Sequence, residues 1–330
     1  MSILILSAND INALLSQGDP EAANQIVDLM EATFSKYTQG QKVAQKAQEA
    51  QSPQRIGVST ETHKVLFMPS RLDHTTSIKI VSVPTKEGLS GLPATILVID
   101  EKTGGVEAVM NADALTAVRT AAGSGVATRY YAHPESKNLV VFGAGAQGRS
   151  HVDMMIAVRP SLQRIAIWNR GETRRLQLIQ DLQKAYPDRT FVSANEQLQD
   201  EVEGADIVCT CTNATEPVLF GQWLKPGVHL NSVGSYRMDM HEVDAETVKR
   251  AEIIAVDSVE ACGHEAGELV KSSKPQDWIE MGNIDKANTD KDRGKITLFK
   301  SVGISVQDSA ISGLMVAKAK QQNLGNIIPF

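Results

Sequence analysis

Apolar and polar residues alternate with different periods along this chain. Residues 3–6 form a short apolar, strand-like run, and Ser7 followed three positions later by Asp10 predicts a capped helix start. Behind Pro20, apolar residues recur about every 3.6 positions as far as Phe34, which indicates one buried helix face. Residues 39–54 are polar, and their pattern fits either a helix or a loop.

Between residues 55 and 110 the period shortens toward two, which is typical of strands. The β-rich runs cover residues 64–68, 77–83 and 95–100, and glycine and proline turn signals separate them. This pattern predicts an antiparallel meander. An Ala- and Thr-rich stretch over residues 113–131 then predicts a helix.

From residue 138 onward, strand and helix patterns alternate. Helices are predicted over residues 147–158 and 172–185, and strands over residues 139–142, 164–168, 190–192, 206–211, 228–233, 253–256 and 296–299. This alternation favours an α/β fold with a Rossmann-type doubly wound parallel sheet. The chain closes with a predicted helix over residues 306–321, whose apolar face needs a surface on which to dock.

The composition narrows the class of protein. A chain of 330 residues, 42% hydrophobic and 22% charged, can bury two domain cores and does not resemble a disordered protein. Its 33 basic and 39 acidic residues give a net charge of −6, which argues against nucleic acid as a partner. No stretch approaches the roughly 20 apolar residues of a membrane span. We expect a cytoplasmic protein with a small-molecule substrate and no membrane partner.

Three cysteines offer metal-ligating side chains. Cys209 and Cys211 lie two positions apart in a predicted buried strand, and no fourth ligand stands at a spacing typical of zinc. The segment from Cys262 to Glu268 contains His264 but lacks the second histidine of a zinc-protease motif. We therefore expect unpaired thiols and no metal site.

The strongest local motif is a glycine-rich turn between a predicted strand and a predicted helix. Gly143 allows a tight turn, Gly145 lets the backbone approach a pyrophosphate, and Gly148 lets helix and strand pack closely. With Ala146 and Gln147 these residues form the helix start that would bind a dinucleotide. The alternative is that the glycines serve only the turn.

The end of the second strand of this unit bears on the identity of the cofactor. NAD enzymes commonly place an acidic residue there for the ribose hydroxyl, but this chain has Asn169 and Arg170. The Arg170 and Arg174 guanidiniums and the Thr173 hydroxyl can hold a 2′-phosphate, although all three also suit a solvated helix start. We therefore expect NADP(H) in preference to NAD(H), with NAD(H) possible.

Three cations precede the glycine-rich turn. Each taken alone is an ordinary surface charge, but Lys79 lies inside an apolar strand and Arg119 lies in an apolar helix. A long cation needs a counter-charge in such a place. A substrate carboxylate would supply one, and Arg55 is the third candidate ligand.

These motifs together resemble the ornithine cyclodeaminase/mu-crystallin family over nearly the whole chain. The matching residues are Arg55 and residues 68–69, 78–81, 91–93, 116–122, 142–147, 233–235, 265–269 and 299–308. The resemblance implies a homodimer with a discontinuous α+β substrate-binding and dimerisation domain, residues 1–118 with 303–330. It also implies a dinucleotide-binding domain over residues 119–302.

The same resemblance implies roles for individual residues. Arg55, Lys79 and Arg119 match the family's substrate-carboxylate ligands, and Asp308 matches an aspartate near its active site, although Asp308 also suits a helix cap. The further matches to cofactor contacts, besides the glycine-rich turn, are Thr120, Asn169, Arg170, Thr212 and Val233.

The chain departs from the family's cyclodeaminases at two positions. Leu66 and Tyr236 stand where those enzymes carry carboxylates for the substrate's amino group. Without these acids cyclodeamination is poorly supported. We therefore expect an NADPH-dependent reductase that transfers a hydride to the C=N of a small, cyclic imino acid. An amino-acid dehydrogenase or cyclodeaminase of the same fold and a non-catalytic, crystallin-like binding protein are the alternatives, and whether Lys79 is the proton donor stays open.

Overall fold

The computed structural model describes residues 2–16, 18–41, 49–86, 89 and 91–330, so residues 42–48 of the polar segment lie outside it. Contacts divide the chain into two units. Unit 1 holds Met1–Gln17, Asp28–Arg119 and Ile304–Phe330, and unit 2 holds Gly18–Val27 and Thr120–Gly303. The unit boundary thus falls within two helices, α2 (Pro20–Gly40) and α3 (Asp113–Tyr131). In the described part of the chain, every helix is too short or too polar to span a lipid bilayer.

Unit 1 is built on one sheet. Its remaining elements are β1 (Ser2–Leu6), α1 (Ala8–Leu15), β2 (Ala50–Gln51), β3 (Ile56–Ser59), β4 (His63–Leu72), β5 (Thr75–Pro84), β6 (Ala94–Ile99), β7 (Val106–Asn111), α10 (Val306–Gln322) and β16 (Asn326–Pro329). Strands β3 to β7 pair antiparallel in chain order, as predicted for the meander. The sheet also takes up β1, parallel to β7, and β16, antiparallel to β1. Helix α1 begins at the predicted capping box of Ser7 and Asp10.

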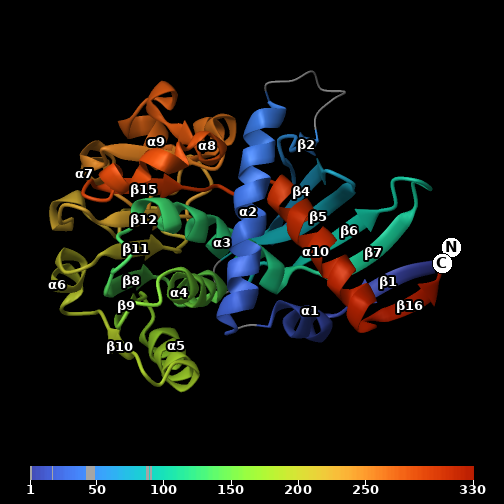
Figure 1. Ribbon diagram of the computed structural model, residues 1–330, viewed down its shortest axis with the longest axis horizontal. Coiled ribbons are helices and arrows are strands. Elements are labelled where there is room, and N and C mark those ends of the chain that lie inside the picture. The colour runs from blue at the N-terminus through green and yellow to red at the C-terminus, as the bar shows by residue number, and fades with distance from the viewer. Residues whose placement is uncertain (1, 17, 42–48, 87–88, 90) are drawn as a thin grey trace. The chain divides into compact units, whose positions relative to one another are not determined.

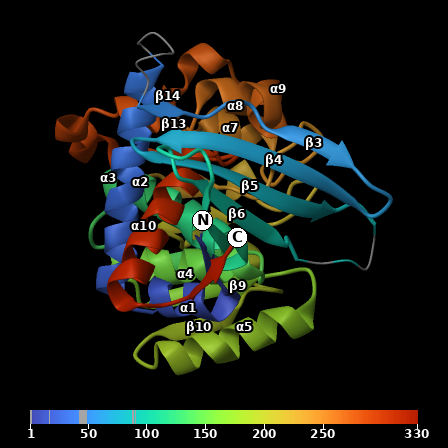
Figure 2. The same ribbon diagram turned by 90° about the vertical axis from the view of Figure 1, so that its right-hand side faces the viewer.

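Helix α10 covers one face of this sheet. It lies along β4, β5 and β6, and Figure 2 shows these strands side by side. Serine hydroxyls fasten the helix to the sheet: Ser70 on β4 and Ser77 on β5 both bond the Ser309 hydroxyl, at 2.7 and 2.8 Å. The apolar face of the C-terminal helix, with Ile311 and Met315 fully buried, thus docks within unit 1.

Unit 2 alternates strands and helices. Its elements are β8 (Asn138–Phe142), α4 (Ala146–Val158), β9 (Arg164–Trp168), α5 (Glu172–Ala185), β10 (Thr190–Ser193), α6 (Leu198–Glu203), β11 (Ile207–Thr210), β12 (His229–Ser232), α7 (Ala245–Arg250), β13 (Ile253–Val256), α8 (Val259–Glu265), α9 (Gly267–Ser272), β14 (Ile279–Glu280) and β15 (Thr297–Lys300). All strand pairs of this sheet are parallel (Figure 1), in the order β10-β9-β8-β11-β12-β15-β13-β14. The order reverses between β8 and β11, which is the arrangement of a doubly wound sheet.

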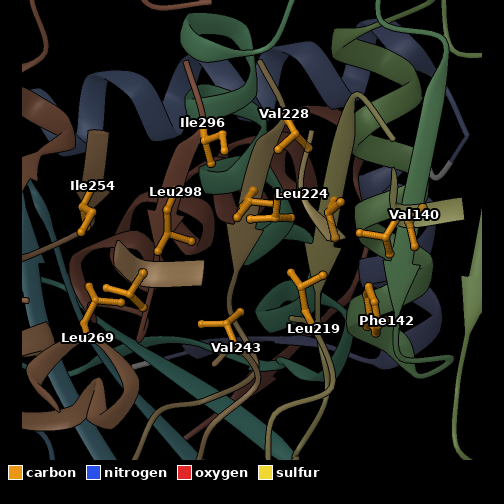
Figure 3. Packing of buried hydrophobic residues seen from close by; sticks show 14 of the residues in the cluster. Val140, Phe142, Leu219, Leu224, Val228, Val243, Ile254, Leu269, Ile296 and Leu298 are labelled. Carbon is orange, nitrogen blue, oxygen red and sulfur yellow. The ribbon is translucent and has the colours of Figure 1, made fainter. Parts of the chain in front are cut away.

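Helices cover both faces of the unit 2 sheet. On one face, the buried Asn231 of β12 donates a hydrogen bond to the Thr128 hydroxyl of α3 at 3.0 Å. On the other face, an apolar cluster joins strand residues such as Val140 and Leu298 to Leu269 of α9 (Figure 3). The predicted α/β fold with a Rossmann-type parallel sheet is therefore confirmed in unit 2, and unit 1 holds the mixed sheet and helices of the expected discontinuous α+β domain.

Candidate active site

Three of the predicted charged residues meet inside unit 1. The ammonium group of Lys79 on β5 lies 2.9 Å from Oδ1 and 2.8 Å from Oδ2 of Asp308, in the first turn of α10. Nε of Arg119 on α3 donates to the same Oδ1 at 3.1 Å. All three residues are at most 4% exposed. One buried carboxylate thus holds two buried cations together.

Strand alternation and the docking of α10 explain how these residues meet. Lys79 pairs directly with Met68 and Ser77 with Ser70, so these four side chains project from the same face of the sheet. That face is the one to which Ser309 of α10 is bonded. Asp308 is the neighbour of Ser309, and its carboxylate bonds the two cations instead of capping the helix.

The electrostatics of this cluster favour the uptake of an anion. Burial, which is the largest cause, and the positive charge of Arg119 lower the pKa of Lys79 to about 7, although the Asp308 carboxylate acts to raise it. Arg55, half-buried between β2 and β3, also lowers this pKa through its charge. The cluster therefore carries more positive than negative charge in a place with little water. A substrate carboxylate would relieve this imbalance.

Sequence reasoning missed Gln307, which precedes Asp308. The Gln307 side chain is 1% exposed, and its Oε1 accepts hydrogen bonds from Arg119 Nη1 and from the Ile304 N–H, both at 3.2 Å. Its amide nitrogen faces the Met30 sulfur at 3.8 Å. Gln307 therefore fixes the second edge of the Arg119 guanidinium. Its place beside Asp308 was the available signal.

The glycine-rich turn of unit 2 has the geometry that a dinucleotide-binding loop needs. Gly143 has φ +111°, a conformation that favours glycine, and a Cβ there would lie 2.6 Å from the Cys211 carbonyl oxygen. A Cβ on Gly148 would overlap the carbonyl oxygen of Gly143. A Cβ on Gly145, by contrast, would meet nothing within 4 Å. Two glycines thus close the turn, and the third keeps its outer side open.

The start of α4 fits a bound diphosphate. Gly145 precedes the helix and has no side chain to cap it, and a helix offers its first N–H groups no partner of its own. Ala146, the first helical residue, is exposed. The side-chain oxygen of Gln147 is buried without a hydrogen-bond partner. An open backbone and an unsatisfied polar atom are what a polar ligand at this turn would use.

The turn after β9 holds the residues expected to read the cofactor's ribose. Asn169 accepts a hydrogen bond from the Ala144 N–H at 3.1 Å, so its side chain also supports the glycine-rich turn. Arg170, Thr173 and Arg174 are exposed at the start of α5 and do not pack in the core. This exposure suits both a phosphate cradle and a solvated helix start.

Arg175 was not predicted, although it lies in this run of charged residues. It is 4% exposed, and its Nη1 donates to the Asn169 carbonyl oxygen at 2.9 Å. Nothing in the sequence marks this contact, because Arg175 lies in a charged segment that suits a solvated helix start. Arg175 therefore holds the backbone from which Asn169 projects.

The remaining predicted cofactor residues lie around the carboxyl ends of the unit 2 strands and in α3. Thr120 is 6% exposed in α3, and Val233, which follows β12, is 9% exposed. The Thr212 hydroxyl donates to Glu242 Oε1 at 2.8 Å. Glu242 is a fully buried acid that sequence reasoning missed, because its segment matches no motif.

The two positions that depart from the cyclodeaminases carry no charge in either unit. Leu66 lies on β4, is 7% exposed and pairs with Val81 of β5. Tyr236 is half-buried in unit 2 and packs against the apolar cluster there. Neither Leu66 nor Tyr236 can bind a substrate amine through a carboxylate.

Of the predicted thiols, Cys209 and Cys262 are buried and Cys211 is half-buried, and all three are free.

Comparison with known proteins agrees with this geometry. The model of the ornithine cyclodeaminase/mu-crystallin family matches residues 9–323. The chain belongs to this family. The ketimine reductase mu-crystallin of Macropus fuliginosus is 35% identical to it over 67% of this chain and 68% of that protein. The Delta(1)-pyrroline-2-carboxylate reductase of Bacillus cereus is 30% identical over 99% of this chain and 100% of that protein.

A solved structure extends the family likeness to the whole fold. The Delta(1)-pyrroline-2-carboxylate reductase of Thermococcus litoralis, in complex with NADH and L-proline, superposes with a TM-score of 0.86 at 29% identity. The match covers 98% of this chain and 99% of that one. The match therefore spans the sequence of both units of this chain.

Proposed function

We propose that this protein is an NAD(P)H-dependent oxidoreductase that reduces the C=N bond of a small, cyclic imino acid. The observation that carries the proposal is the buried cluster of Lys79, Arg119 and Asp308, whose excess positive charge suits a substrate carboxylate. The names of the mu-crystallin and pyrroline-2-carboxylate reductase relatives support the same reaction class. The apolar residues Leu66 and Tyr236 support a reductase over a cyclodeaminase.

The cationic residues divide the binding of the carboxylate between them. Arg119 is held by Asp308 and Gln307, so its guanidinium keeps one orientation, and with Arg55 it grips the substrate carboxylate. Lys79 adds a compact charge beside them. Asp308 positions Lys79 and Arg119, and its negative charge offsets part of the repulsion between these two buried cations.

The reaction forms one C–H and one N–H bond. The nicotinamide cofactor, when bound, supplies the hydride that the C=N carbon receives. The imine nitrogen gains a proton, so the product is the cyclic amino acid. Lys79, whose pKa is about 7, can release a proton near neutral pH and is the group we propose as the source of this proton.

Turnover measurements test the proposal. Purified protein is assayed for loss of NADPH or NADH absorbance with Delta(1)-pyrroline-2-carboxylate and its six-membered homologue, and with 2-oxo acids plus ammonium. We expect the cyclic imines to be reduced much faster than the 2-oxo acids are aminated. Faster amination would identify an amino-acid dehydrogenase. Cofactor binding without turnover of any compound would favour a crystallin-like binding protein.

We further propose that NADPH is preferred over NADH. The two residues directly after β9, Asn169 and Arg170, are not acidic. Arg170, Thr173 and Arg174 are exposed at the start of α5, where a 2′-phosphate would find two guanidiniums and a hydroxyl. The double variant R170S/R174S should lose about 10-fold or more in NADPH affinity and little in NADH affinity. Comparable kcat/KM values for the two cofactors in the unaltered protein would contradict the preference.

The cellular setting and the assembly are also proposals. We propose a cytoplasmic homodimer in which residues 1–118 with 303–330 bind the substrate and the second subunit, and residues 119–302 bind the cofactor. The resemblance to the family supports this division of labour. The placement of the cation cluster within unit 1 and of the glycine-rich turn within unit 2 supports it as well.

A further inference from the structure

A buried acid joins the ends of two neighbouring strands in unit 2. Glu242, which is fully buried, accepts four hydrogen bonds. Its Oε1 accepts from the Thr212 N–H at 2.5 Å and the Thr212 hydroxyl at 2.8 Å. Its Oε2 accepts from the Thr210 hydroxyl at 2.9 Å and the Gly234 N–H at 2.6 Å. One carboxylate thus links the carboxyl end of β11 to that of β12.

Glycine at position 234 makes this link possible. A Cβ there would overlap the Thr212 carbonyl oxygen and would lie 2.5 Å from Glu242 Oε1. No side chain larger than hydrogen fits between the two strand ends. The Thr212 and Gly234 backbones therefore approach each other closely only with glycine at position 234. The Glu242 carboxylate fits between them for the same reason.

The backbone of Glu242 is itself held from two sides. Its N–H donates to Glu268 Oε2 at 2.7 Å, and its carbonyl oxygen accepts from the N–H groups of Val218 and Leu219 at 2.9 and 3.1 Å. Glu268 is in turn paired with the buried Lys300 at 2.7 Å. Glu242 cannot move without breaking contacts with four segments of the chain.

The four donors hold both carboxyl oxygens of Glu242. Two of them are backbone N–H groups, which can only donate. Burial is the largest cause that raises the pKa of Glu242; the negative charge of Glu268 adds to the rise, and the positive charge of Lys300 acts against it. A buried carboxylate with four donors is a rigid element, because each lost hydrogen bond leaves a buried polar group unsatisfied.

The position of this link in the sheet connects it to the cofactor. In doubly wound sheets, ligands bind at the carboxyl ends of the strands where the strand order reverses, here between β8 and β11. The glycine-rich turn follows β8, and the proposed ribose residues follow β9. The ends of β11 and β12 lie on the opposite side of β8, where the other half of an extended dinucleotide must lie.

We propose that Glu242 is a positioning residue for the nicotinamide half of the cofactor, which it serves by fixing Thr212 and Gly234. This inference rests on the proposed function, since it presupposes a bound nicotinamide dinucleotide. Glu242 touches neither the cofactor nor the substrate itself. It sets the surface against which the nicotinamide ring is placed.

The variant E242Q and a matched control test this role. Glutamine keeps the shape of glutamate but replaces one acceptor oxygen by an NH₂ group, which would face donors. The control D206N alters an acid at the amino end of the same strand, β11, where Asp206 accepts the N–H groups of Lys137 and Asn138 and pairs with Lys225. That end lies away from the carboxyl ends at which ligands bind.

The readouts are the midpoint of thermal unfolding, kcat, and dissociation constants measured by titration. The two ligands are NADPH and the 2′-phosphate of ADP-ribose, which is the cofactor without its nicotinamide. We expect E242Q to bind the fragment within about twofold of the unaltered protein, and NADPH about 10-fold more weakly, with a lower kcat. D206N should lose thermal stability while both affinities and kcat stay unchanged.

The outcomes separate the inference from the function on which it rests. If E242Q bound the fragment and NADPH more weakly by the same factor, Glu242 would only stabilise unit 2 in general. An unchanged affinity for NADPH would exclude a positioning role. An unaltered protein that binds neither NADPH nor NADH would instead contradict the proposed function. If E242Q does not fold, T210V serves instead, because it removes one donor to Glu242 Oε2 at a buried site. We expect T210V to bind NADPH about threefold more weakly and to bind the fragment unchanged. An equal loss of affinity for both ligands would again overturn the role.

Discussion

Lys79 carries its charge in surroundings that do not favour it. The side chain is 1% exposed, and its ion-pair partner, Asp308, is shared with Arg119. Burial is the largest cause that lowers its pKa from 10.5 to about 7, and Arg119 is the next. Near neutral pH this lysine therefore exists in both protonation states, which is the condition under which a group can hold an anion and also release a proton.

Activity should follow this titration. Protonated Lys79 attracts the carboxylate and carries a proton, so kcat/KM for imine reduction should fall as the pH rises through about 7. K79R keeps its charge to alkaline pH, so its profile should lose the fall that belongs to Lys79 and retain only that of the substrate's own imine. K79M should lose roughly 100-fold or more at every pH. Near-unaltered turnover by K79M would show that the lysine has neither role.

The titration of Lys79 should also affect the stability of the ligand-free protein, but in the opposite direction to its effect on activity. Between about pH 7 and 10.5, unfolded Lys79 binds a proton that folded Lys79 has released. The unfolded state then binds more protons, so the Lys79 contribution to the free energy of unfolding rises with pH across that window. Unfolding midpoints in the absence of ligand should show this slope, and K79M should lack it. An equal slope in K79M would assign it to other groups.

At the scale of elements, Gly148 and Gly145 in the turn between β8 and α4 have different surroundings. Substitutions at the two positions should therefore differ in their effects on stability and cofactor affinity. G148A places a Cβ on the carbonyl oxygen of Gly143, a backbone atom that cannot turn aside, so we expect a lower unfolding midpoint and lost cofactor affinity. G145A meets no atom within 4 Å, so the midpoint should hold while cofactor affinity falls about 10-fold, because the methyl group occupies the path of the pyrophosphate. Tight cofactor binding by G145A would place the pyrophosphate elsewhere.

Helix α3 depends on a distant arginine for its carboxyl end. Arg159, which follows α4, is 7% exposed and donates to the carbonyl oxygens of Thr128, Arg129 and Ala132. Thr128 and Arg129 lie in the last turn of α3, and Ala132 directly follows it. The Thr128 carbonyl also accepts the Ala132 N–H at 3.1 Å, and the carbonyls beyond it lie where partners within the helix run out. R159M should therefore lower the free energy of unfolding by about 3 kcal/mol, as measured in urea. R129M, which breaks the bonds to Asn24, is the matched control and should cost less; an equal cost would refute the capping role.

The elements that sequence reasoning predicted well are those set by local interactions. The strand, turn and helix around the glycine-rich motif were placed within a residue or two, because their apolar runs and glycine conformations lie within about twenty neighbouring positions. Strand β16 was missed, since its pairing with β1 joins the two ends of the chain and leaves Ile327 74% exposed. No local pattern marks such a strand.

The candidate site shows the same division. Lys79 and Arg119 were recognisable because a cation in an apolar run is unusual in itself. The choice between a capping and an active-site role for Asp308 needed the docking of α10 on β5, which brings together residues 229 positions apart. Gln307, at the start of a predicted helix, and Glu242, in a loop, were missed because a glutamine or glutamate in such a place looks ordinary until its burial is known.

At the scale of the molecule, the outer strand β3 of unit 1 is where we place the contact of the proposed homodimer, because it lies next to Arg55. Ile56 is 63% and Val58 53% exposed on this edge strand, which directly follows Arg55. Exposed apolar edges of this kind are usually covered by another chain. A second copy that covers β3 would also enclose the segment that presents Arg55 to the substrate.

The double variant I56K/V58K should therefore be a monomer by light scattering, with a raised KM for the imino acid and unchanged NADPH affinity, because the glycine-rich turn belongs to unit 2. I327K is the matched control. It places the same charge on the opposite edge of the same sheet, β16, and should leave both the dimer and the KM unchanged. If I56K/V58K stays dimeric while I327K dissociates, the subunits meet at β16, and Arg55 does not depend on a partner.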